Sequence, residues 1–139
     1  MITPIQTNQI PLFSSPVSAG TPFPADANVD QFIDLNEFLI KNPTATFFVR
    51  VEGTSMINAG IHPGDILIVD KSIDPAPNNI VIAVIDGEFL VKRLITECGI
   101  KYLVPDNPDF GRIDIGNGTQ IEIWGVVTWV IHKSAVCSR

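Results

Sequence analysis

The sequence is short of basic residues and cysteine, and it has no long hydrophobic run. Nine lysines and arginines stand against 15 acidic residues, which gives a net charge of −6. Because phosphate binding requires a basic surface, direct binding of duplex DNA is not expected. Apolar runs such as Val126–Ile131 are far shorter than the roughly 20 residues of a membrane-spanning helix. No membrane association is therefore expected.

The two cysteines, Cys98 and Cys137, show no spacing that would mark them as a disulfide or a metal pair. The first residues lack the charged region and continuous apolar block of a signal peptide. These absences predict a cytoplasmic protein with free thiols. They suggest no metal site and no cofactor.

What the sequence does contain indicates a small strand-rich protein. Its 139 residues are 45% hydrophobic, enough to form the core of one domain. Eleven prolines and ten glycines favour many turns over a helical bundle. Five prolines fall within residues 1–28, which we expect to form an extended N-terminal arm. Residues 29–139 are expected to form a single compact domain, mostly β.

The hydrophobic pattern predicts one short helix followed by short, twisted, largely antiparallel strands. Asp34–Lys41 carries an apolar stripe, with Asp34 and Glu37 spaced as in a capping box and Asn42-Pro43 as the stop. Strands are predicted from Thr46, at Ile66–Val69, Ile80–Ile85, Glu88–Ile95 and Lys101–Val104, and at Gln120–His132 with a break at Gly125. Asp86-Gly87 predicts a tight hairpin turn.

Ser55 is a candidate nucleophile. It follows Gly53 at the end of the predicted strand that starts at Thr46. A serine at a strand-to-turn junction exposes its hydroxyl, and the backbone N–H groups of Thr54, Ser55 and Met56 are then candidates for an oxyanion hole. Such a serine is more often an ordinary turn or cap residue, so the interpretation depends on finding a base.

Lys92 is the candidate base. In a strand it shares its face with Leu90 and Leu94, which favours burial. Full burial lowers a lysine pKa from about 10.4 by up to about 3–5 pH units, so the neutral amine becomes able to accept a serine proton. The alternative is a side chain that packs on apolar surface and extends its ammonium to water.

The two histidines are weaker candidates. His62 lies in a predicted turn and His132 follows a strand near the C-terminus. A Ser-His-Asp triad is therefore not favoured. Upstream, Ala19-Gly20 is a bond between two small residues that a serine could approach closely, although a flexible linker would have the same composition.

Two blocks of sequence resemble a known family. Gly53–Met56 with Gly60–Asp70, and Asp86–Leu94, resemble the self-cleaving serine peptidases of the SOS response: the LexA repressor, related phage repressors and UmuD. Ile33–Ile40 and Asn42–Thr46 resemble UmuD in particular. The similarity spans about residues 17–131. Because no N-terminal helical DNA-binding domain is evident, the sequence resembles UmuD more than a repressor.

The resemblance implies roles for the matched positions. Ser55 would be the nucleophile, Lys92 its general base and Ala19-Gly20 the bond that is cut. Ala-Gly is the form found in LexA, whereas UmuD proteins usually carry Cys-Gly. The resemblance also implies a homodimer, cleavage stimulated by a RecA–single-stranded DNA filament, and a cleaved form that assists a UmuC-type error-prone translesion polymerase.

Two other functions remain open from the sequence. One is a UmuD-like binding module that has kept the fold without cleaving itself. The other is a Ser/Lys protease that cuts other chains in trans, although such enzymes act at membranes and no membrane anchor is evident. A stand-alone transcriptional repressor is disfavoured by the acidic charge.

Overall fold

The computed structural model of the 139-residue chain describes residues 8–21, 28–115 and 120–135. Contacts divide the chain into two units, Met1–Lys41 and Asn42–Arg139. The sequence suggested an arm that ends at residue 28, and the extent of the peptidase domain stays a prediction.

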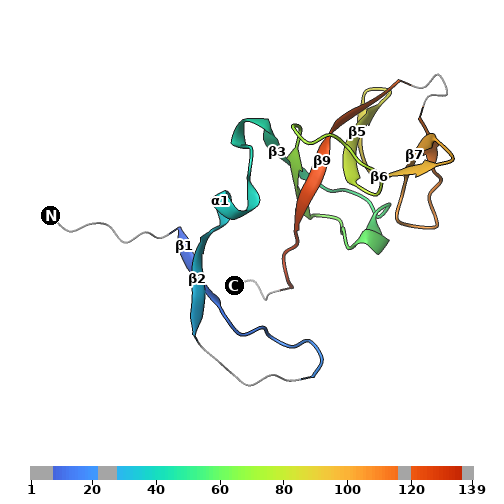
Figure 1. Cartoon of the computed structure of the whole chain (residues 1–139). Helices are drawn as coiled ribbons and strands as arrows, with labels where there is room; N and C mark the ends of the chain where they lie inside the picture. Colours follow the sequence, from blue (N-terminus) through green and yellow to red (C-terminus); the bar gives the residue numbers. More distant parts are fainter. Residues whose placement is uncertain (1–7, 22–27, 116–119, 136–139) are drawn as a thin grey trace. The chain divides into compact units, whose positions relative to one another are not determined.

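The first unit contains a pair of antiparallel strands, β1 (Gln9–Phe13) and β2 (Val29–Asp34) (Figure 1). Extended backbone was expected at β1 because of the prolines, but its pairing with a second strand was not. The loop between the two strands contains Ala19 and Gly20. Beyond β1 the backbone N–H of Ser14 donates to the Asn28 carbonyl at 2.9 Å, which closes the start of this loop.

A single turn of helix, α1 (Leu35–Leu39), follows β2. Asp34 caps it as predicted, but its carboxylate accepts from the N–H of Asn36 at 3.0 Å rather than from that of Glu37. The predicted extension to Lys41 is wrong, because Ile40 is already extended, with φ −113° and ψ 101°.

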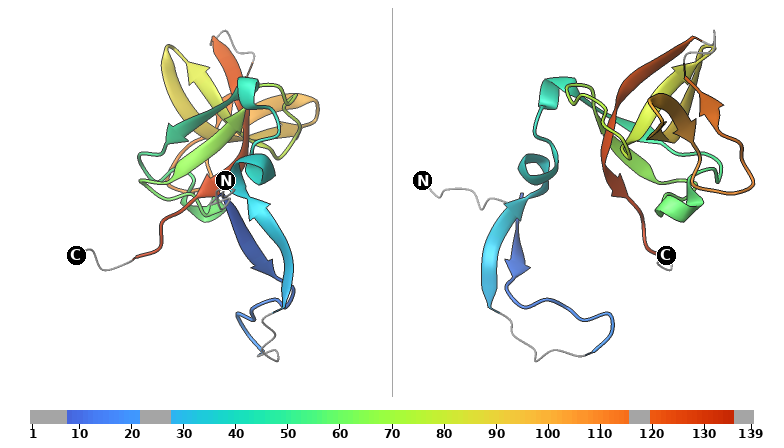
Figure 2. Two further views of the ribbon diagram at one scale, coloured as in Figure 1. Left: turned by 90° about the vertical axis from the view of Figure 1, so that its left-hand side faces the viewer. Right: turned by 45° about the vertical axis from the view of Figure 1, so that its right-hand side comes forward.

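The second unit is one antiparallel sheet with strand order β3-β4-β9-β5-β6-β7-β8 (Figures 1 and 2). Its elements are η1 (Pro43–Ala45), β3 (Thr46–Arg50), η2 (Ile57–Ala59), β4 (Ile66–Asp70), β5 (Ile80–Ile85), β6 (Glu88–Glu97), β7 (Ile100–Val104), β8 (Ile113–Asp114) and β9 (Ile121–Ile131). The predicted fold class, mostly β and antiparallel with one short α-helix, is confirmed. Within the described ranges, no helix is long and apolar enough to cross a membrane.

Two apolar clusters fill the second unit, one on each side of β5. The first consists of Val51, Met56, Ile61, Leu67, Val69 and Ile82, and the second of Val81, Ala83, Ile85, Leu94, Leu103 and Val126. The neighbours Val81 and Ile82 belong to different clusters and are at most 1% exposed. β5 is therefore covered on both faces, as its unbroken apolar run predicted.

The hairpin that joins β5 to β6 sets the position of the candidate base. Asp86 and Gly87 both adopt positive φ, 50° and 82°, which is the requirement of a type I′ turn. Ile85 pairs with Glu88 across it, so the turn contains two residues and the predicted hairpin is confirmed. This register places Lys92 opposite Val81.

β9 runs through Gly125 without the predicted break. Ile82 pairs with Gly125 but Ala83 pairs with Ile123, so Trp124 is an extra residue in a β-bulge. A Cβ atom on Gly125 would lie 2.6 Å from the Val69 Cγ1 atom. The glycine is thus explained by close packing of β9 against β4, not by the end of a strand.

Candidate active site

Ser55 lies in a turn held between the end of β3 and the start of β4. Val51, just beyond β3, donates to the Asp65 carbonyl and accepts from Gly64, each at 2.8 Å. Gly53 then takes φ 80°, which favours glycine and redirects the chain toward Ser55. The turn that carries the candidate nucleophile is therefore fixed by backbone hydrogen bonds at its base.

A cleft of about 260 Å³ has Ser55 in its wall. Its other lining residues are Val49, Arg50, Val51, Glu52, Leu67, Ile82, Phe89, Leu90 and Val91. Most of these are apolar, so the cleft suits a small-residue peptide segment better than a charged ligand. β6 supplies three of the residues, Phe89–Val91, and Lys92 comes next along the strand.

Lys92 is buried, with 6% of its surface exposed. Burial lowers the pKa of its ammonium below the ordinary lysine value. Among the described residues no carboxylate pairs with its Nζ atom. Its Nζ atom lies over the Phe110 ring, 5.7 Å from the ring centroid, a cation–π contact. The predicted burial of the side chain is confirmed.

The structure thus brings the Ser55 turn against the strand that carries Lys92. Within the described part of the chain no hydrogen bond joins the two side chains. Hydrogen bonds of a catalytic pair are often long before substrate binds. The Ser55–Lys92 dyad accordingly stays a prediction about the reacting state.

The backbone of the Ser55 turn leaves donors available. The carbonyl of Thr54 accepts from Ile57 N–H at 3.1 Å and from the Asn107 side-chain amide at 2.9 Å. By contrast, no described acceptor takes the N–H groups of Thr54, Ser55 or Met56. Free N–H groups beside a candidate nucleophile are what an oxyanion hole requires. The assignment of these three groups to that role stays a prediction.

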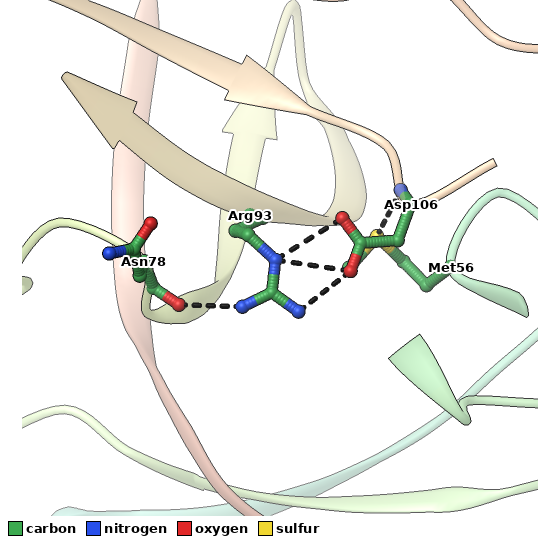
Figure 3. Close-up of polar contacts among 4 residues, drawn as sticks. All are labelled: Met56, Asn78, Arg93 and Asp106. Carbon is green, nitrogen blue, oxygen red and sulfur yellow. Dashed lines mark hydrogen bonds and ion pairs between the residues drawn. The ribbon is translucent and has the colours of Figure 1, made fainter. Parts of the chain in front are cut away.

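Asp106, in the segment after β7, pairs with Arg93 of β6 through its side chain and contacts the Ser55 turn through its backbone (Figure 3). Arg93 donates to the Asp106 carboxylate, with Nη2 2.6 Å from Oδ2, and also to the carbonyl of Asn78 at 2.8 Å. The backbone N–H of Asp106 lies 3.3 Å from the Met56 Sδ atom, and its carbonyl accepts from Asn58 at 2.8 Å. We call this arrangement the Arg93–Asp106 clamp. It links Met56, which follows Ser55, to Arg93, which follows Lys92. The sequence did not predict the contact of Arg93 with Asp106, because nothing in the spacing of the two residues indicates it.

The expected cut site lies in the first unit. Ala19 and Gly20 are exposed, and the N–H of Gly20 bonds to the Ser18 hydroxyl at 3.0 Å. No atom would lie within 4 Å of a Cβ at Gly20. The bond is therefore sterically accessible, as a substrate for a serine must be.

Neither histidine lines the cleft of Ser55, but the two lie together elsewhere in the second unit. Their rings are 5.0 Å apart between centroids, and both approach the buried carboxylate of Asp65. The candidate ligand atoms of His62, Asp65 and His132 all lie within 4.8 Å of one another. The sequence did not predict this cluster, since 70 positions separate the two histidines.

The sequence matches a family model and several known proteins. The model of the peptidase S24-like family matches residues 11–128. Protein MucA of Salmonella typhimurium is 41% identical over 136 residues, which are 96% of this chain and 92% of MucA. Protein ImpA of Shigella flexneri is 46% identical over 125 residues, 89% of this chain and 84% of ImpA. The LexA repressor of Clostridioides difficile strain 630 is 38% identical over 125 residues, 89% of this chain and 58% of that repressor.

Proposed function

The chain belongs to the peptidase S24-like family, and from that premise we propose that it is a serine peptidase that cuts its own Ala19-Gly20 bond. The observation that carries the proposal is the state of Lys92. This residue is 6% exposed, has a pKa lowered by burial, and stands next to the strand segment that lines the Ser55 cleft. Such a lysine is suited to act as a base, and its position matches the one implied by the resemblance to LexA and UmuD.

In the proposed reaction, the neutral amine of Lys92 takes the proton of the Ser55 hydroxyl as its oxygen attacks the Ala19 carbonyl carbon. Backbone N–H groups of Thr54, Ser55 and Met56 stabilise the oxyanion that forms. Lys92 returns the proton to the departing Gly20 nitrogen, which leaves an ester between Ala19 and Ser55. Water, deprotonated by Lys92, then hydrolyses the ester and restores the serine.

We further propose the cellular role that the resemblance implies. The protein would act in SOS mutagenesis as a cytoplasmic homodimer, and a RecA–single-stranded DNA filament would stimulate cleavage. The cleaved form would serve as accessory subunit of a UmuC-type translesion polymerase. The net charge of −6 agrees with recruitment through such proteins rather than through duplex DNA.

The test is incubation of the full chain at pH 10, followed by mass spectrometry. High pH deprotonates Lys92 without the filament, so we expect a single cut between Ala19 and Gly20. Ser55→Ala and Lys92→Ala should each slow the cut by about 10⁴-fold or more. Lys101→Ala, at an exposed position on β7, is the matched control and should be cut normally. Normal cleavage of either catalytic variant would contradict the mechanism.

The same assay separates the other functions. Wild-type protein mixed with the Ser55→Ala chain would cut that chain only if cleavage proceeds in trans. A wild-type chain that stays whole at pH 10, and also with the RecA filament at neutral pH, would instead be a non-cleaving binding module.

A further inference from the structure

A second polar cluster lies where β4 begins and β9 ends, away from the residues that line the Ser55 cleft. Ile66 pairs with Ile131, so continuing the antiparallel register brings Asp65 opposite His132. Asp65 Oδ1 lies 2.6 Å from His132 Nδ1. His62 joins the cluster from the turn before β4, with its Nδ1 atom 3.9 Å from Asp65 Oδ2.

The backbone holds two of the three residues in place. The turn from His62 to Asp65 has proline second and Gly64 third, with φ 90°, as in a type II turn. Asp65 N–H donates to the His62 carbonyl at 3.1 Å, and His62 N–H donates to Asp65 Oδ2 at 2.9 Å. The geometry therefore does not depend on flexible side chains alone.

The electrostatics of the cluster favour a cation. The Asp65 side chain is 2% exposed. Its Oδ2 atom accepts a hydrogen bond from the His62 N–H at 2.9 Å, and its Oδ1 atom lies 2.6 Å from His132 Nδ1. The cluster thus places a buried carboxylate, an acceptor suited to a cation, between two imidazole rings. The two histidine side chains that approach it are 45% and 56% exposed, so an ion can reach their rings from solvent.

One ligand atom in the cluster is unused. His62 Nδ1 is shielded from solvent and has no hydrogen-bond partner among the described residues. A buried polar atom without a partner costs free energy, which a bound ligand would recover. In the tautomer protonated at Nε2, the Nδ1 atom carries a lone pair suited to a metal ion.

We propose that His62, Asp65 and His132 form a binding site for a divalent transition-metal ion, with zinc as the best match. Two imidazoles and a carboxylate are a common zinc set, and a fourth position would remain for water. Imidazole ligands argue against calcium and magnesium, which prefer oxygen. Ligand atoms around tetrahedral zinc are about 3.3 Å apart, so atoms within 4.8 Å need only small side-chain rotations. The ion would replace the present close contact between Asp65 Oδ1 and His132 Nδ1.

The test is calorimetric titration of zinc chloride into the chelator-treated full chain. We expect saturable binding of one zinc ion per chain. His62→Gln and His132→Gln each keep a polar side chain. Loss of a residue that only supports a metal ligand weakens binding by about 10- to 100-fold, and loss of either histidine should weaken zinc binding by more than that. Thermal unfolding without metal checks that both variants fold. Zinc binding is measured without reference to cleavage, so the result tests the metal site separately from the proposed function.

The chain offers a clear control, because these are its only two histidines. A Cys98→Ser, Cys137→Ser double variant should bind zinc as the parent does. Cobalt, used as a spectroscopic probe, should give visible bands of nitrogen and oxygen ligation without thiolate charge-transfer bands. The proposal is overturned by an absence of saturable zinc binding, by parental affinity in either glutamine variant, or by loss of binding in the cysteine variant.

Discussion

At the scale of single residues, Lys92 meets opposite demands from stability and from chemistry. Its burial beside Val81 and Leu94 costs free energy whenever the side chain is charged. The same burial lowers its pKa and prepares it to act as a base. No described carboxylate offsets the cost. A charged lysine at this position therefore lowers the stability of the fold, as expected of a side chain that serves a function.

This conflict predicts that Lys92→Met stabilises the protein. The pKa of Lys92 is lower in the folded state than in the unfolded state. The free-energy cost of burying its charge is therefore fully present when the pH is below the folded-state pKa, and it disappears when the pH is above the unfolded-state pKa of about 10.4. In a Ser55→Ala background, urea unfolding at pH 7 should show that Lys92→Met raises the free energy of unfolding by more than the about 0.5 kcal/mol typical of exposed substitutions. This increase in the free energy of unfolding should be smaller at pH 10. An equal gain at both pH values, or an equal gain from exposed Lys101→Met, would contradict the argument.

The sequence predicted some of these residue-level features and missed others. Lys92 could be identified because its strand neighbours on the same face are leucines, a purely local pattern. The turn at Asp86-Gly87 followed from its two residues alone. By contrast, the contact of Asp65 with His132 depends on the register between β4 and β9, which no local pattern specifies.

At the scale of elements, the Arg93–Asp106 clamp joins β6, the segment after β7 and the Ser55 turn (Figure 3). Its side chains are 27% and 19% exposed, so water screens them only in part. The exposed pair Arg112–Glu97, at 51% and 55%, provides a comparison of the same chemistry on the surface.

We expect Asp106→Asn to lower the free energy of unfolding by about 1.5–3 kcal/mol, the range for hydrogen bonds to charged groups. It should also slow self-cleavage, because the Ser55 turn and β6 are no longer held together. Glu97→Gln should change stability by at most about 1 kcal/mol and leave cleavage unchanged. Denaturant unfolding and the pH 10 cleavage assay measure both effects. Equal effects of the two substitutions would show that the clamp is an ordinary surface pair.

Strands with a strong apolar pattern were predictable, whereas very short strands and the pairing of exposed strands were not. The runs that became β4, β5 and β6 carry strong apolar patterns, and each was predicted within a few residues. β8 has only two residues, too few for any pattern. β1 and β2 are exposed along most of their length, so their sequences show no alternation of buried and exposed positions. The glycine at 125 was misread because close packing and strand breaks select the same residue.

At the scale of the whole molecule, the chain consists of two units that differ in how much apolar core they contain. Both apolar clusters and all seven strands of the large sheet belong to Asn42–Arg139. In its described residues the first unit has one strand pair and one turn of helix, and several of the large apolar side chains there are exposed, among them Ile10, Phe13 and Phe32.

We therefore expect residues 42–139 to fold alone. A protein that begins at Asn42 should keep the β-type circular dichroism of the full chain, and its thermal midpoint should lie within a few degrees. The physical reason is that the deletion removes no residue of either core cluster. Loss of cooperative unfolding in the shortened protein would show that the first unit is required for the fold.

The burial of Lys92 also has a consequence for synthesis of the protein. A base created by exclusion of water exists only once the sheet around it has formed, because in an unfolded chain the same lysine keeps its proton at neutral pH. Under the proposed chemistry, a nascent chain on the ribosome contains its cut site before Lys92 is buried and able to act as the base. Under that chemistry each new molecule cannot cut itself until it has folded, and no separate inhibitor is needed during translation.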